Sequence, residues 1–154
     1  MPIISLYLDS NAFISFLEGN PSESEALRPL FESLRSYPGA GVTSELTLAE
    51  VLAGSHKRGP QMKRAYLDLI VWSKFLTLSP VTRDILYQSA ELCVVHKDAH
   101  SKKLGLLDAI HLATAIEGKC GYFVPGDKGI MPPIGMTRVG PEAESIQDIC
   151  RALA

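Results

Sequence analysis

Four acidic residues stand where folding could gather them at one site. They are Asp9, Glu50, Asp108 and Asp127. Asp9 ends an apolar run typical of a buried strand, and Asp127 follows another short apolar run at a turn, whereas Glu50 and Asp108 lie within apolar helical stretches. Because ionised carboxylates repel one another and are costly to desolvate, a fold that gathers several needs a compensating charge. A divalent cation that prefers oxygen ligands supplies it. The four acids therefore point to a metal-dependent site that cleaves phosphodiesters.

The segments that carry these acids alternate between short apolar strands and longer amphipathic helices. Strands are expected over residues 3–8, 39–42, 76–78, 121–124 and 136–139. Helices are expected over residues 11–17, 21–35, 46–52, 61–75, 80–96, 106–116 and 142–153. Ser22 and Glu25 are spaced as a capping box at the start of the second helix, and Thr43 or Ser44 is expected to cap the helix of Glu50. This alternation predicts an α/β fold with a mostly parallel sheet, in a single domain over residues 1–154.

The carboxyl edge of such a sheet is where ligands gather. Asp9 and Asp127 both follow strands, so both are expected at that edge. The helix that begins near Asn11 directs its free N–H groups to the same place, which favours an anion such as phosphate. Asn11 could orient Asp9 or a metal-bound water, or it could simply cap its helix.

Length, charge and cysteine content narrow the class of protein. The 154 residues suit one domain with a real core, and a formal charge of −2 makes no global case for nucleic-acid binding, although local basic residues could contact phosphates. No stretch is long and apolar enough for a membrane span, and the N-terminus lacks a signal-peptide pattern. Three widely spaced cysteines favour a reducing cytoplasm. No P-loop, dinucleotide-binding fingerprint or serine-hydrolase elbow is present.

Each of the four acids lies in a short segment, and the order of these segments along the chain is informative. They are residues 7–11 (YLDSN), 43–52 (TSELTLAEVL), 107–115 (LDAIHLATA) and 124–127 (VPGD). Together they resemble the PIN-domain family, and within it the VapC-like toxin ribonucleases, over nearly the whole chain. The resemblance implies a three-layer α/β/α sandwich, a Mg²⁺ or Mn²⁺ site and cleavage of RNA. It also implies a toxin of a toxin–antitoxin pair, with a small antitoxin as partner and a homodimer as the assembly.

The same resemblance assigns roles to the four acids. Asp9, Asp108 and Asp127 would hold the metal, directly or through water. Glu50 would complete the metal's shell or help to deprotonate the attacking water. One departure concerns Asp127, because Gly126 precedes it where the family often has Asn or Thr, and Lys128-Gly129-Ile130 follows it where the family often has an apolar or aromatic residue shortly after.

Each acid also has a purely structural interpretation. Asp9 could cap the helix after its strand, and Glu50 could lie on an exposed helix face. Asp108 could interact with the dipole at the start of its helix, and Asp127 could only form a turn.

Two further polar residues lie near the acids in the sequence. His111 is three residues after Asp108 on the same helical face, so it could contact substrate, bond a site carboxylate, or be a packing residue. Ser44 could touch the site or only cap its helix. The alternative function is a catalytically silent PIN-like domain that binds RNA or acts as a scaffold. A phosphatase is less well supported, because the chain lacks an Asp-x-Asp pair at Asp9.

Overall fold

The computed structural model describes residues 4–55, 57–96, 103–124, 130–140 and 142–154. Five strands in this part of the chain form one sheet in the order β3-β2-β1-β4-β5, and every neighbouring pair is parallel. They are β1 (Leu6–Leu8), β2 (Gly41–Ser44), β3 (Leu76–Ser79), β4 (Tyr122–Val124) and β5 (Thr137–Arg138). The predicted parallel sheet is confirmed, with β1 at its centre.

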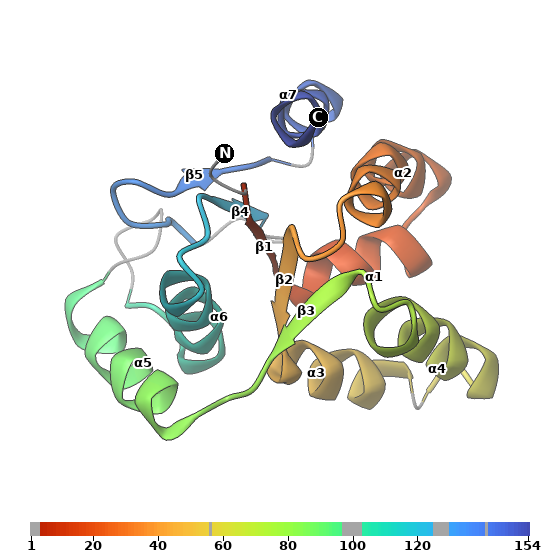
Figure 1. Cartoon of the computed structure of the whole chain (residues 1–154). Coiled ribbons are helices and arrows are strands. Elements are labelled where there is room, and N and C mark those ends of the chain that lie inside the picture. Colours follow the sequence, from red (N-terminus) through yellow and green to blue (C-terminus); the bar gives the residue numbers. More distant parts are fainter. Residues whose placement is uncertain (1–3, 56, 97–102, 125–129, 141) are drawn as a thin grey trace.

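Helices cover both faces of the sheet (Figure 1). They are α1 (Ser10–Glu18), α2 (Pro21–Ser36), α3 (Glu45–Ser55), α4 (Pro60–Leu67), α5 (Arg83–Val95), α6 (Leu106–Glu117) and α7 (Ala143–Leu153), with a π-helical turn η1 (Asp68–Trp72) after α4. Figure 1 shows α5 and α6 on one side of the sheet and α1, α2 and α4 on the other. The expected α/β/α sandwich is therefore confirmed. None of the helices within the described ranges is long and apolar enough to cross a bilayer.

Strand β1 is buried on both faces, because its side chains alternate between them. Leu6 and Leu8 belong to the larger core that includes residues of α1, α2 and α7, whereas Tyr7 belongs to the core formed with α6. Tyr7 pairs in register with Phe123 of β4, and their rings stack with centroids 5.3 Å apart. The tip of β1 thus delivers Asp9 to the centre of the sheet's carboxyl edge.

The capping box of α2 is formed by other residues than the sequence predicted. The backbone N–H of Glu23 donates to Asn20 Oδ1 over 2.9 Å, and the backbone N–H of Asn20 donates to Glu23 Oε2 over 3.2 Å. The prediction of Ser22 and Glu25 was wrong because Pro21 occupies the first helical turn. Proline lacks an N–H and is favoured there, so the residue before it becomes the cap.

Candidate active site

Asp9 lies at the junction of β1 and α1, and its side chain is almost fully buried. Its backbone N–H donates to the carbonyl oxygen of Val124, which fixes the junction against β4. Asp9 occupies the N-cap position of α1, but its side chain makes no capping hydrogen bond. Instead, Oδ1 accepts a hydrogen bond from the Ser10 hydroxyl over 3.0 Å. The carboxylate is therefore not used to cap α1, although it is only 3% exposed.

Glu50 of α3 and Asp9 approach the same imidazole nitrogen on α6. His111 Nε2 lies 2.6 Å from Glu50 Oε1 and 3.4 Å from Asp9 Oδ1. His111 is 1% exposed, whereas the side chain of Glu50 is 28% exposed. Glu50 is thus not simply a residue of a solvated helix face, since its carboxylate reaches a buried partner. The fold brings two acids that are far apart in the sequence, one at the β1–α1 junction and one on α3, to one point.

Tyr7 contacts the other nitrogen of the same ring. Its hydroxyl lies 2.7 Å from His111 Nδ1, and the tyrosine is fully buried. Because carboxylates only accept, His111 Nε2 carries the proton that faces Glu50. In the neutral imidazole the Tyr7 hydroxyl then donates to Nδ1, and in the imidazolium it accepts from Nδ1. Tyr7, His111 and Glu50 therefore form one hydrogen-bonded relay from the sheet to the acids.

The charges around this relay alter the protonation of its members. Burial lowers the pKa of the His111 imidazole. The hydrogen bond to Glu50 raises this pKa, as do the negative charges of Asp9, Glu50 and Asp108. Together these effects outweigh burial, so the pKa of His111 lies above its usual value. Burial, and then the charge of Asp9, raise the pKa of Tyr7 well above its usual value. The hydroxyl therefore stays protonated and available to the ring.

Asp108 lies in the exposed first turn of α6, where a carboxylate also interacts favourably with the helix dipole. The negative charges of Asp108 and Asp9 both raise the pKa of His111, so both aspartates act on the same ring. Asp127, the fourth acid predicted from the sequence, lies outside the described residues.

The two polar residues that could support the site differ in their contacts. Asn11 is half-buried in the first turn of α1 and does not occupy the N-cap position, which belongs to Asp9. Ser44 is fully buried, and its hydroxyl oxygen accepts from the backbone N–H of Leu46 over 3.0 Å, so it caps α3 as predicted. The polar side chains of Ser44 and Thr47 also act on Tyr7 and partly offset the rise of its pKa. Ser44 therefore influences the relay as well as capping the helix.

The ligand atoms of Asp9, Glu50 and His111 lie within 4.8 Å of one another, close enough to share one cation.

The role of Tyr7 was not predicted from the sequence. A signal was present, because Tyr7 stands two residues before Asp9 in an apolar run, and alternate residues of a strand point to the same face. A long polar side chain at position 7 therefore extends from the same side of the sheet as Asp9 and can reach the groups around that acid.

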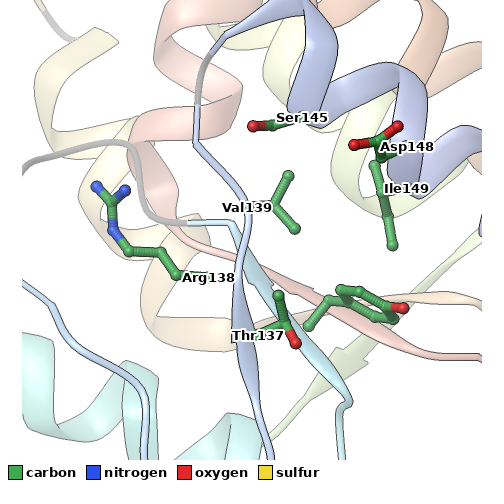
Figure 2. A pocket seen from close by; sticks show the side chains of 7 residues that line it. Thr137, Arg138, Val139, Ser145, Asp148 and Ile149 are labelled. Atoms are coloured by element: carbon green, nitrogen blue, oxygen red, sulfur yellow. The ribbon is translucent and has the colours of Figure 1, made fainter.

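A separate pocket of about 200 Å³ lies between β5 and α7 (Figure 2). Figure 2 shows Ser145 and Asp148 reaching it from α7, while Thr137, Arg138 and Val139 come from the β5 segment. Asp148 is its only lining acid among the described residues, and this carboxylate pairs with Arg151. The pocket therefore lacks the convergent acids found at Asp9.

Comparison with known proteins places the chain in a family. The family model for the PIN domain matches residues 6–130. No curated protein sequence matches the chain. VapC20 of Mycobacterium tuberculosis, described as a toxin that cleaves the sarcin-ricin loop, superimposes with a TM-score of 0.63 at 19% identity, covering 77% of this chain and 87% of its own.

Two further solved structures show the same likeness. A toxin–antitoxin complex from Klebsiella pneumoniae has a TM-score of 0.63 at 24% identity, covering 90% of this chain and 98% of its own. FitAcB from Neisseria gonorrhoeae has a TM-score of 0.61 at 18% identity, covering 88% and 97%. These similarities to solved structures show the fold alone. The family model matches most of the chain, and that match shows the family. The chain belongs to the PIN-domain family.

Proposed function

We propose that this protein is an endoribonuclease that depends on a divalent cation, Mg²⁺ or Mn²⁺, and cleaves RNA phosphodiesters by water attack. The observation that carries the proposal is the convergence of Asp9 and Glu50 on His111 Nε2 at 3.4 and 2.6 Å. PIN-domain membership supports the same activity.

The residues of the site suit a hard cation. Within the described ranges, neither Asp9 nor Glu50 forms an ion pair with lysine or arginine, and both instead approach the His111 imidazole, which is a cation only when it is protonated. A nearly buried carboxylate beside a second one requires more positive charge than one imidazole supplies. Oxygen-rich sites suit Mg²⁺ and Mn²⁺, whereas imidazole suits softer metals. Asp9 would therefore hold the cation, Asp108 and Asp127 would be its further carboxylate ligands as the PIN-domain resemblance implies, and His111 would act on Glu50.

The chain's own residues would divide the remaining work. A bound cation would lower the pKa of its water and stabilise the charge that develops on the phosphate. Glu50 would accept the proton of the attacking water, because its partly exposed carboxylate is held in place by His111 Nε2. Tyr7 would keep the imidazole oriented from the opposite side. The free N–H groups at the start of α1 would hold a phosphate oxygen of the RNA.

The biological setting follows from the same proposal. The protein would act in the cytoplasm as the toxin of a toxin–antitoxin pair, inhibited by a small antitoxin, and would form a homodimer. The Klebsiella structure, which is described as a toxin–antitoxin complex, supports the antitoxin partner. Residues 1–154 would form one domain. The packing of α7 on α2 supports this extent, although α7 lies beyond the matched residues 6–130.

Cleavage of single-stranded RNA by the purified protein tests the proposal. Wild type should cleave with Mg²⁺ or Mn²⁺ and stop in EDTA, and Asp9→Asn and Asp108→Asn should each lose at least ~100-fold in rate. Asp148→Asn is the matched control, since it removes an exposed carboxylate that pairs with Arg151. Undiminished cleavage by Asp9→Asn would contradict the mechanism. RNA binding without cleavage by any metal-loaded preparation would favour a silent scaffold instead.

A further inference from the structure

The end of α3, α4 and the turn η1 carry an excess of positive charge that the rest of the chain does not share. Residues 51–75 contain five of the 15 lysines and arginines and one of the 17 acids, a formal charge of +4, whereas the rest of the chain carries −6. The five basic residues are all exposed: Lys57, Arg58, Lys63, Arg64 and Lys74. None of the three lysines forms an ion pair with a described residue. A local excess of this kind attracts a polyanion even though the whole chain is acidic.

The positive charge begins one helical turn from the acidic site. Gly54 follows Glu50 by four residues on the same face of α3, about 6 Å along the helix. A Cβ on Gly54 would lie 3.5 Å from Arg58 Nη1, so the guanidinium lies over that face. The Glu18 carboxylate holds Arg58 there at 2.7 Å, and 49% of the Arg58 side chain stays exposed. A polyanion that extends from the acids along α3 therefore meets Arg58 first.

The charge continues along α4, which packs beside α3 (Figure 1). Lys63 lines a pocket of about 270 Å³ at the junction of the two helices, together with Ser55 and Gly59. The guanidinium of Arg64 lies 5.0 Å from the centroid of the Trp72 ring. Trp72 is 50% exposed and lies on the π-helical turn η1, a form often found at functional sites. An exposed aromatic ring among cations is the combination that binds single-stranded nucleic acid, by stacking and by charge.

We propose that a basic surface made of Lys57, Arg58, Lys63, Arg64, Trp72 and Lys74 binds a single-stranded segment of the RNA that flanks the cleaved phosphodiester. The cations contact its phosphates, and one base stacks on Trp72. This inference rests on the proposed function, because it assigns a second binding region for the same RNA, but the binding itself requires neither a metal ion nor cleavage. An acidic protein segment would match the charges but has no base to stack on the ring, so Trp72 favours RNA.

RNA binding in EDTA tests the surface apart from cleavage. Trp72 is the only tryptophan of the chain, so its fluorescence reports a stacked base directly. An unstructured RNA of about 12 nucleotides should quench it. The slope of log Kobs against log salt should be about −2 to −3.5, as three to five phosphate contacts require, and Lys63→Gln should reduce its size by about 0.7. Unchanged fluorescence at saturating RNA overturns the proposal, as does an oligoglutamate that competes as well as the RNA.

Substitutions separate stacking from charge, with binding measured on end-labelled RNA. Trp72→Ala should weaken binding at least about fivefold in Kd, whereas Trp72→Phe keeps a ring and should retain most of the affinity. Arg64→Gln and Arg151→Gln form a matched pair, since each removes an exposed arginine, 70% and 74% exposed, that pairs with an aspartate one helical turn away. Only Arg64→Gln should weaken RNA binding. Equal effects of the two arginine variants, or equal losses for Trp72→Ala and Trp72→Phe, would refute the assignment.

The cleavage assay distinguishes a failure of this inference from a failure of the proposed function. With Mg²⁺, Trp72→Ala should raise KM for the longer RNA at least about fivefold and leave kcat unchanged, because it removes binding that substrate and transition state share. Cleavage of an RNA too short to reach Trp72 should not change. Binding in EDTA that depends on Trp72, without cleavage in any metal ion, supports the basic surface and contradicts the proposed nuclease. Cleavage of both RNA lengths that is indifferent to Trp72 contradicts the basic surface alone.

Discussion

Replacing Tyr7 by phenylalanine tests the relay that links the sheet to the acids. The substitution keeps the ring that stacks on Phe123 and removes only the hydroxyl 2.7 Å from His111 Nδ1. The imidazole then has no partner on that nitrogen and no fixed orientation towards Glu50. We expect losses of both stability and activity.

The stability loss can be worked from burial. Tyr7 is 0% and His111 1% exposed, so water does not readily replace the missing hydroxyl. Leaving a buried polar atom unpaired costs about 1–3 kcal/mol. In a chain of this length, about 1 kcal/mol corresponds to roughly 2–4 °C in Tm, so a 2 kcal/mol loss lowers Tm by about 4–8 °C. Removing a group that orients a site residue typically lowers metal affinity or activity by about 10- to 100-fold.

The assay pairs thermal unfolding in EDTA with RNA cleavage in Mn²⁺, using Tyr7→Phe and Tyr37→Phe side by side. Tyr37 is 42% exposed, and its hydroxyl makes no hydrogen bond within the described residues, so its substitution should change neither quantity. Equal Tm values and equal cleavage rates for the two variants would refute the relay. A lowered Tm with normal cleavage would reduce Tyr7 to a packing residue.

Three further predictions concern His111, Asp9 and one hydrogen bond remote from the site. The pKa of His111 is raised on folding, so its proton stabilises the fold fully below the unfolded value of ~6.5 and this contribution is lost as pH rises through the folded pKa. In EDTA, the Tm difference between wild type and His111→Gln should therefore shrink with rising pH. A difference that stays constant with pH would contradict the raised pKa of His111. Mg²⁺ or Mn²⁺ at 100 times Kd should stabilise wild type by about 2.7 kcal/mol, and Asp9→Asn should abolish the shift in a thermal melt. Tyr66→Phe should cost about 1–3 kcal/mol in urea unfolding, because the buried Tyr66 hydroxyl donates to the Glu18 carboxylate at the end of α1.

Local signals predicted most of the fold because each one acts within a few residues. The apolar run before Asp9 forms β1, Ser44 caps α3, and Gly105 occupies the N-cap position of α6. The predicted helix over residues 61–75 is instead α4 followed by the π-helical turn η1. The apolar pattern around Leu69 and Ile70 fits both forms, since both leave these residues facing the core. Only packing against the rest of the molecule selects the wider turn.

The position of His111 shows why a site is harder to predict than the elements that carry it. The sequence left open whether this histidine packs in the core or bonds a carboxylate, and the structure shows that it does both. Its partners are 104 residues away at Tyr7 and 61 residues away at Glu50, so no local pattern records them. What the sequence does contain is the face on which each residue lies, because Tyr7 alternates with the core leucines of β1 and His111 follows Asp108 by one helical turn. Faces become contacts only when the parallel sheet fixes β1 beside β2 and β4. A buried polar residue two positions before a site acid should therefore be examined as a positioning residue before it is assigned to the core.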